Sequence, residues 1–536
     1  MKELVSHLGR KVMGVLSGFD RMLFRGLLRC VADAYGMNGY LYGAGVAMKD
    51  FKVHTEQVTE FVKSQSLREA RETGCEVRYI PDSHTRKKNV ALAIAQRDGI
   101  REGRICVLAA VEPCFTFHVR RHRETKTIAL ERRRGKCLHL YHYFNHPQFG
   151  LMHVRLQTWF PFGIQICLNG REWLARQLQA AGIDYAQQDN SIWQVADFQA
   201  AQEFLDSQLT AAWPTLLDGL RRIVHPAHER VFANCPAHVR NYYWTVAESE
   251  WASDLLFRDP SDVWPLCERL VRYSMRVHGA GDVMRFLGRT VRKDGLPRST
   301  FQGAIQSDVR EFHQGLRIKH WLNSNSVKMY NRPGILRFET TINNPGEFKV
   351  WRTTEKNPDA DPAWLRLRKG VSDLHRRAQV SQASNNRLAA AQAAGLDEGQ
   401  RLSECAESLC SRVRRPGRKK PDGTRTRSRT FRALNPLAPG DIALLRAVAR
   451  PEFAISGLRN HDLRAVLYHT EPTDKTQQRR QSSAVSRKLA LLRAHGLLEK
   501  VPKSHRYRVT AKGGQSLTAL LAAASATTAE LTKLAA

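Results

Sequence analysis

The sequence lacks the features that would assign it to several common protein classes. It has no apolar run long enough for a transmembrane helix and no opening signal peptide, so we expect a cytoplasmic protein without a membrane partner. It has no Walker A motif, no G-x-G-x-x-G and no G-x-S-x-G, so ATPase, dinucleotide and serine-hydrolase activities have no support. Its ten cysteines include no C-x-x-C, which favours reduced thiols.

Acidic residues are also scarce relative to basic ones. The chain has 51 Asp and Glu against 84 Lys and Arg, which gives a formal net charge of +33. A positive field of this size attracts polyanions. We therefore expect DNA as the partner, with RNA as the alternative, and the sequence leaves open whether the protein forms an oligomer.

The 536 residues are enough for about three domains. Strand-like and helix-like segments both occur, so the expected fold class is α+β with several domains. Residues 11–29 are expected to form a strand pair or a bulged strand. Residues 249–257 (SEWASDLLF) are expected to form a helix. The expected domains are a mixed α/β domain over 1–210, a helical region with a β-hairpin over 211–370, a charged helix and basic linker over 371–432, and a winged helix with an Ala-rich helical tail over 433–536.

The clearest periodic pattern lies near the C-terminus. Val485, Leu489 and Leu492 recur at the spacing of one buried helix face, and Gly496 follows as a natural C-cap. Two shorter helices precede this one, the first with Asp441 as its expected cap, and two short strands follow it. The expected elements are helices over 441–449, 460–468 and 479–495 and strands over 497–501 and 505–510.

The segment LALLRAHGLLEKVPKSHRYRVTAKG resembles the recognition helix and wing of bacterial MarR-like and ArsR-like winged-helix regulators. The resemblance implies that the third helix enters a major groove and that the hairpin grips the backbone or the minor groove. A winged helix used for protein contact is the alternative, and the density of Arg and Lys argues against it. The DNA-contacting residues that we expect are Arg480, Ser483, Arg487 and Lys488 on the helix and Lys503, His505, Arg506 and Arg508 on the hairpin.

Three carboxylates stand at the ends of probable strands or inside them: Asp20, Glu112 and Glu339. Two-metal phosphodiester chemistry requires acidic side chains that project from a sheet toward one point, and Mg²⁺ prefers carboxylates together with substrate phosphates. The trio would suit an RNase H-like nuclease or transposase core with Mg²⁺ as its cofactor. The alternative is structural, with Asp20 paired to the adjacent Arg21 and Glu112 capping a loop before Pro113.

Residues 326–341 (SVKMYNRPGILRFETT) faintly resemble the K-x-Y-x-K…L-R-x-E stretch of phage and plasmid rolling-circle replication initiators. The matching positions are Lys328, Tyr330, Arg337 and Glu339, and the resemblance implies Tyr330 as a nucleophile. The chain departs from those initiators because it has no metal-binding His-hydrophobic-His motif. An ordinary hairpin with a surface tyrosine is the alternative.

Cysteine and histidine cluster in KCLHLYHYFNHPQFGLMH, which contains Cys137, His139, His142, His146 and His153. No standard zinc-finger spacing fits them, so we assign no metal ligands there.

Together these patterns predict a sequence-specific DNA-binding protein of a bacterial mobile or replicative element. The C-terminal winged helix would choose the site, and the basic N-terminal part would engage nucleic acid. The first alternative is a Mg²⁺-dependent nuclease or transposase that uses Asp20, Glu112 and Glu339. A replication initiator is the second, and a non-enzymatic RNA-binding scaffold is the third.

Overall fold

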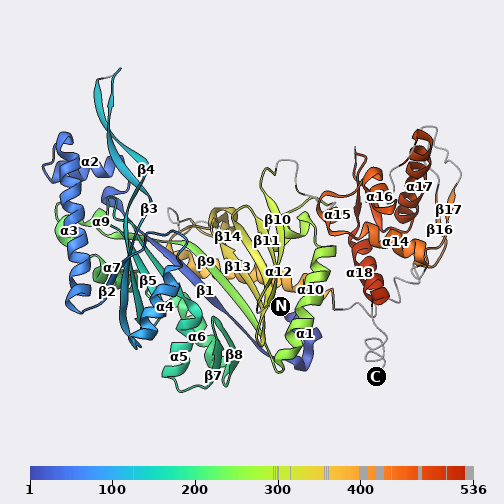
Figure 1. The fold of residues 1–536 in the computed structure, drawn as a ribbon, viewed down its shortest axis with the longest axis horizontal. Coiled ribbons are helices and arrows are strands. Elements are labelled where there is room, and N and C mark those ends of the chain that lie inside the picture. The colour runs from blue at the N-terminus through green and yellow to red at the C-terminus, as the bar shows by residue number, and fades with distance from the viewer. Residues whose placement is uncertain are drawn as a thin grey trace. The chain divides into compact units, whose positions relative to one another are not determined.

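The structure is a computed structural model. It describes residues 1–525 apart from 125, 294, 296, 298–300, 314, 355–356, 358, 360, 397–408, 417–427, 436–437, 469–471, 473 and 503. Helices and strands are both abundant, and the expected α+β, multi-domain class is confirmed (Figure 1). The chain divides into two units, each made of separate stretches. The four consecutive domains expected from the sequence stay a prediction. We call residues 13–257 and 333–383 the sheet unit, and residues 1–12, 258–332 and 384–536 the helical unit.

The sheet unit is built on eight hydrogen-bonded strands in the order β13-β9-β1-β6-β5-β4-β3-β2. The pairs β13–β9, β1–β6, β6–β5, β5–β4 and β4–β3 are antiparallel, and β2–β3 is parallel. Strands from both ends of the unit therefore lie side by side. The bounds are β1 Val12–Leu28, β2 Glu76–Tyr79, β3 Gly103–His122, β4 Thr127–His146, β5 Gly150–Gln157, β6 Ile164–Asn169, β9 Tyr242–Phe257 and β13 Ile335–Ile342.

Strand β1 is one continuous strand rather than a strand pair. Its glycines allow neighbours to approach closely. A Cβ at Gly18 would lie 2.7 Å from the Leu205 side chain, and one at Gly26 would lie 2.7 Å from the Trp244 ring. The burial pattern of β1 loses its alternation at Gly18–Asp20, where three successive residues are buried.

Helices cover the two faces of this sheet. On one face, a large aromatic core packs against α2 (Ala34–Gly43), α3 (Phe51–Glu72), α7 (Trp213–Val224) and the start of α12 (Leu374–Ala393). The other face is covered at one end by α4 (Lys87–Arg97) and at the other by α5 (Gly170–Ala180), α6 (Phe198–Thr210) and the hairpin of β7 (Tyr185–Gln188) and β8 (Ser191–Val195). The far part of the β3–β4 hairpin extends past the neighbouring strands (Figure 1), because β5 pairs only with His139–His146 of β4.

The segment 249–257 is a strand, so the expected helix is wrong. It forms the second half of β9, and every residue from Trp251 to Phe257 is buried. Both faces of this half of β9 are covered, so its apolar residues do not alternate with polar ones. Without alternation, periodicity cannot distinguish a buried strand from a buried helix.

The first half of the helical unit contains a three-stranded antiparallel meander, β10 (Ile305–Phe312), β11 (Gly315–Leu322) and β12 (Asn325–Arg332), with α10 (Val263–Val277) and α11 (Ala280–Phe286). Strand β12 ends at Arg332, and the next strand begins at Ile335, after Pro333 and Gly334. Across the residues that the structure describes, no helix combines the length and the apolar character needed to cross a membrane.

The C-terminal part of the helical unit has the order of elements expected of a winged helix. Leu458 makes an isolated bridge to Tyr507, which adds a third short strand to the hairpin. Val485, Leu489 and Leu492 are buried, as predicted, and Gly496 follows the third helix with a φ of 75°. The elements are α14 Pro439–Val448, α15 Pro451–Ser456, α16 Asn460–Leu467, α17 Lys475–Ala494, β18 Leu498–Lys500, β19 Tyr507–Val509 and α18 Ala511–Ser525.

Three local details of this region differ from expectation. Helix α14 begins at Pro439, so Asp441 lies inside its first turn and pairs with Arg432 rather than capping the helix. Helix α17 begins at Lys475, before the expected 479, because the Asp474 side chain accepts a hydrogen bond from the Gln477 backbone N–H. The two ends of the expected linker are the paired strands β16 (Val413–Arg415) and β17 (Arg429–Phe431).

Candidate functional site

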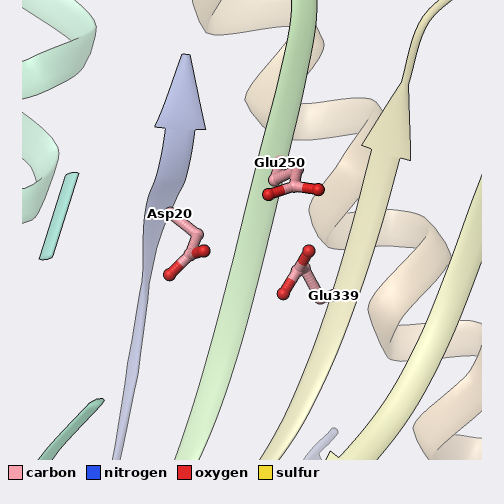
Figure 2. A group of neighbouring side chains, drawn as sticks. All are labelled: Asp20, Glu250 and Glu339. Carbon is pink, nitrogen blue, oxygen red and sulfur yellow. The ribbon is translucent and has the colours of Figure 1, made fainter. Parts of the chain in front are cut away.

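Three carboxylates from distant parts of the sequence converge on one face of the sheet unit. Asp20 on β1, Glu250 on β9 and Glu339 on β13 each offer an oxygen, and these oxygens all lie within 4.8 Å of one another (Figure 2). Among the described residues, no other group of three or more His, Cys, Asp or Glu side chains meets this criterion. Asp20 and Glu339 come together as predicted, and the third member is Glu250.

The register of the sheet explains this convergence. Glu250 lies opposite Thr341 and Glu339 lies opposite Ala252, so the two glutamates are diagonal neighbours on one face of the β9–β13 pair. Diagonal neighbours in an antiparallel sheet are within reach of long side chains. Strand β1 is the next strand on the other side of β9, and it brings Asp20 to the same place.

Two buried arginines, Arg337 and Arg171, pair with Asp20 and Asp254. Arg337 Nη1 donates to Asp20 Oδ1 at 2.8 Å, and its Nε and Nη2 donate to both oxygens of Asp254 at 2.5 and 2.9 Å. Arg171 Nη2 lies 2.9 Å from Asp254 Oδ2. The Asn190 side chain gives Asp20 a second hydrogen bond of 2.8 Å. These bonds fix the Asp20 carboxylate in one orientation.

Negative charge exceeds positive charge around this site. Glu250 receives a hydrogen bond of 3.2 Å from Arg21 Nε, and Arg21 also pairs with Glu248. The cluster thus holds five carboxylates, Asp20, Glu248, Glu250, Asp254 and Glu339, and three guanidinium groups, Arg21, Arg171 and Arg337. If all eight are ionised, the carboxylates outnumber the guanidinium groups by two, and a divalent cation bound there would be favoured by this local negative charge.

The pKa of Asp20 responds to its burial and to its charged neighbours. Asp20 is 6% exposed and Glu339 is 1% exposed. Burial raises the pKa of Asp20, Arg337 lowers it, and the nearby Glu339 carboxylate raises it, with a net rise. A cation bound between the two would favour the charged form of both carboxylates.

Glu112 does not belong to this site, and the predicted trio is therefore corrected. Its strand β3 lies four strands from β1, roughly 19 Å at the usual spacing between strands. Glu112 accepts hydrogen bonds from Lys87 Nζ at 2.9 Å, from the Tyr141 hydroxyl at 2.7 Å and from Arg155 Nη1 at 3.1 Å. Burial alone would raise the pKa of Glu112, but these hydrogen bonds and the nearby positive charges lower it, and the net pKa lies below its usual value. Its role is that of a structural ion pair.

The residues that sequence reasoning missed are Glu250, Asp254 and Arg171. Glu250 and Asp254 lie in the segment that was expected to be a helix, and a helix would not place their side chains on a sheet face. The alternation Glu248, Glu250, Ala252 and Asp254 was the available signal, because residues two apart share one face of a strand. Nothing near Arg171 in the sequence points to its partner, which lies 83 positions further along the chain.

The four residues that resemble a rolling-circle initiator fall into two places. Arg337 and Glu339 lie on β13 in the cluster just described. Lys328 and Tyr330 lie on β12 in the helical unit, where the Lys328 ammonium is 5.3 Å from the centroid of the Tyr330 ring. Tyr330 lines a cavity of about 620 Å³ together with Phe312, Arg317 and Arg332.

The predicted DNA-contacting residues of α17 lie on its exposed side. Arg480, Ser483 and Arg487 are exposed, and Lys488 is half-buried. On the hairpin, His505 is exposed and Arg506 is half-buried. Arg508 is half-buried and pairs with Glu499, so its charge is partly compensated. Lys503 lies outside the described residues.

The Cys and His cluster around residue 140 is mostly internal. His139 and His142 are fully buried, and burial lowers their pKa values to about 4 and about 3. The expectation of no metal ligands there stays a prediction.

Comparisons with known proteins yield no relative: no protein-family model, no curated protein and no solved structure matches the chain.

Proposed function

We propose that this protein is a DNA-binding, divalent-metal-dependent nuclease or transposase, as part of a mobile or replicative element. The observation that supports this most is the convergence of the Asp20, Glu250 and Glu339 carboxylates on three neighbouring strands. Hard cations such as Mg²⁺ bind through a few carboxylates and complete their coordination with water and substrate phosphate. A metal in such a site supplies Lewis acidity to a phosphodiester and lowers the pKa of bound water.

The protein's own residues divide this work. Asp20, Glu250 and Glu339 would hold the cation, and Arg337 and Asn190 keep Asp20 oriented through the bonds described above. Glu250 is the most accessible of the three, with a side chain 17% exposed, and Arg21 beside it is 44% exposed. Arg21 is therefore the cation best placed to meet a phosphate oxygen that enters the site. The buried members shield the site from bulk water, which strengthens each electrostatic interaction there.

Site selection would belong to the C-terminal region. An exposed helix face with Arg480, Ser483 and Arg487 is suited to phosphates and base edges. The resemblance to winged-helix regulators points the same way. The RNase H-like alternative rested on the order Asp20, Glu112, Glu339, and with Glu112 elsewhere that argument no longer applies.

A second function is a DNA-binding protein without catalysis, and the exposed basic face of α17 favours it independently of the carboxylates. The two proposals differ in metal binding. In the nuclease, Mn²⁺ or Mg²⁺ stabilises the folded chain by about 2.7 kcal/mol at a concentration one hundred times its Kd. In the non-catalytic protein, stability is independent of the metal.

The experiment titrates the full chain with Mn²⁺ by calorimetry, follows its Tm, and assays Mg²⁺-dependent nicking of plasmid DNA. Glu339→Gln keeps the size of the side chain and removes its charge. We expect it to abolish the Mn²⁺ heat, the Tm shift and the nicking while DNA affinity in EDTA stays near that of the wild type. Metal-independent stability together with intact plasmid in the wild type would refute the nuclease and leave the DNA-binding protein.

A further inference from the structure

The open part of the sheet face next to the carboxylates carries a row of polar side chains. Strand pairing places Arg25 of β1 opposite Gln165 of β6, Gln165 opposite Arg155 of β5, and Arg155 opposite Tyr141 of β4. Directly opposed residues in a sheet point to the same side. Arg25, Gln165, Arg155 and Tyr141 thus form a continuous line across four strands, and none of them is buried.

A second row runs parallel to the first and leads to the acidic site. It consists of Leu23, Cys167, His153 and Tyr143, each opposite the next. Arg21 and Lys88 both act electrostatically on the Cys167 thiol, as do Glu248 and Glu250. Arg21 of β1 pairs with Glu248 and Glu250 beside this row. Lys88 of helix α4 lines a hollow together with Tyr143 and His153 of the row.

Helix α4 borders a hollow at the end of these rows. The cavity has a volume of about 550 Å³ and is lined by Arg86, Lys87 and Lys88 at the start of the helix and by Tyr141, Tyr143 and His153 from the sheet. Lys87 is engaged with Glu112. Arg86 and Lys88 are exposed. The basic side chains at the start of α4 thus lie at the edge of a wide, open hollow on the sheet face.

The positive charge on this face is compensated only in part. Glu112 pairs with both Lys87 and Arg155, and Glu248 and Glu250 pair with Arg21. Within the described part of the chain, the Arg25 guanidinium makes no ion pair. Burial, together with repulsion from Arg155 and Arg132, lowers the pKa of Arg25. Cations that repel one another are stabilised by a polyanion laid across them.

We infer that this face, defined by Arg25, Gln165, Arg155 and Lys88, is a track for the phosphates of a single DNA strand that leads into the carboxylate site. The inference rests on the proposed nuclease function and adds the path of its substrate. A single strand fits because Asp20 and Glu339 are almost fully buried, and an unpaired nucleotide can approach buried side chains more closely than a base-paired one. Arg25 and Arg155 are two strand spacings apart, roughly 10 Å, which is enough for more than one phosphate contact.

The test measures binding of a fluorescent, unstructured 20-nucleotide single-stranded DNA to the full chain in EDTA, as a function of salt. The double variant Arg25→Gln with Lys88→Gln removes two exposed charges, neither of which holds the metal. We expect the affinity to fall about tenfold or more. The slope of log Kd against log salt should become shallower by about 1.4, since each phosphate contact on a single strand contributes about 0.7.

A matched control changes the same charges on the opposite face of the sheet unit. Arg71 lies on α3 and Lys49 just before it, both are exposed, and α3 packs against the other side of β3. Arg71→Gln with Lys49→Gln should leave affinity and salt slope near those of the wild type. An equal loss of affinity in both double variants would show that binding depends only on net charge, and it would overturn the proposed track.

Two further outcomes separate this inference from the proposed nuclease function. An unchanged affinity and slope in Arg25→Gln with Lys88→Gln, with an unchanged Tm, would overturn the track even if Mn²⁺ binds. A loss confined to a 20-base-pair duplex probe would overturn the single-strand assignment. If binding of the single-stranded DNA depends on Arg25 and Lys88 while the wild type shows no Mn²⁺ heat, the track is supported and the nuclease function is refuted.

Discussion

The carboxylate cluster of the sheet unit and the exposed face of α17 are built in opposite ways. In the cluster, charged groups are buried and come from strands separated by hundreds of residues, as with Asp20 and Glu339. On α17, the charged groups are exposed and lie within a few residues of one another in sequence, as with Arg480 and Arg487. The comparison shows that one chain can present a non-local, preorganised site for a cation and a local, adaptable surface for a polyanion.

The difference in burial also determines how much each charged group affects the stability of the fold. A buried charge loses its hydration and depends on its partners, so removing one partner leaves the other uncompensated. An exposed charge keeps most of its water and contributes little to stability. Substitutions in each region test this contrast.

Arg337→Ala should destabilise the folded protein by about 3–5 kcal/mol, because it leaves Asp20 and Asp254 buried without their shared guanidinium. Urea unfolding measures this free energy. Arg480→Ala on α17 is the matched control and should stay within about 0.5 kcal/mol of the wild type. Similar values for the two variants would remove the distinction between the regions.

Glu250→Gln should reduce Mg²⁺-dependent DNA cleavage by about 100-fold or more, because it takes a charged ligand from the cation. Glu112→Gln, the residue that the sequence suggested, should leave cleavage within about threefold of the wild type, since Glu112 lies four strands from β1. Plasmid nicking under single-turnover conditions gives both rates. The reverse ranking would restore the original trio.

Arg487→Ala should cost about 1–3 kcal/mol of binding free energy at the preferred DNA site and less on random DNA, as for a base contact in the major groove. The preferred site is first selected from a random duplex library with the wild-type chain. Fluorescence anisotropy then compares the two DNAs. Equal losses on both would make Arg487 a phosphate contact, and no loss would take α17 out of the interface.

The smallest effect is a pH dependence of stability to which His142 of the sheet unit contributes. His142 is fully buried, its Nε2 lies 3.0 Å from Ser66 Oγ, and burial lowers its pKa to about 3. The unfolded chain takes up the proton near pH 6.5 and the folded chain does not, so His142 destabilises the fold as pH falls below about 6.5, by up to about 1.4 kcal/mol per pH unit.

Urea unfolding between pH 7 and pH 5 measures this slope. His142→Gln should make the slope shallower. His505→Gln, at an exposed position on the hairpin of the helical unit, should leave the slope unchanged. If both variants keep the full slope, the pH dependence arises from other groups.

Part of this architecture was predictable from local patterns. The buried face of α17 and the turn after it follow from a 3.6-residue period and a glycine, both of which are short-range signals. Asp20 and Glu339 were recognisable as carboxylates in apolar strands. Strand β16, inside the expected charged helix and basic linker over 371–432, has no local signal, because its Arg415 donates hydrogen bonds to the carbonyls of Arg493 and Ala494, which are distant in sequence.

The amino-acid sequence by itself determined the α+β class, the helical period of α17 and the excess of positive charge, because each depends on composition or on neighbours a few residues apart. Only the tertiary structure decided that Glu250 joins Asp20 and Glu339 and that Glu112 does not. The physical reason is strand pairing. A residue's partners across a sheet are set by strand order and register, and no local pattern in a strand such as β9, whose second half is buried on both faces, encodes them.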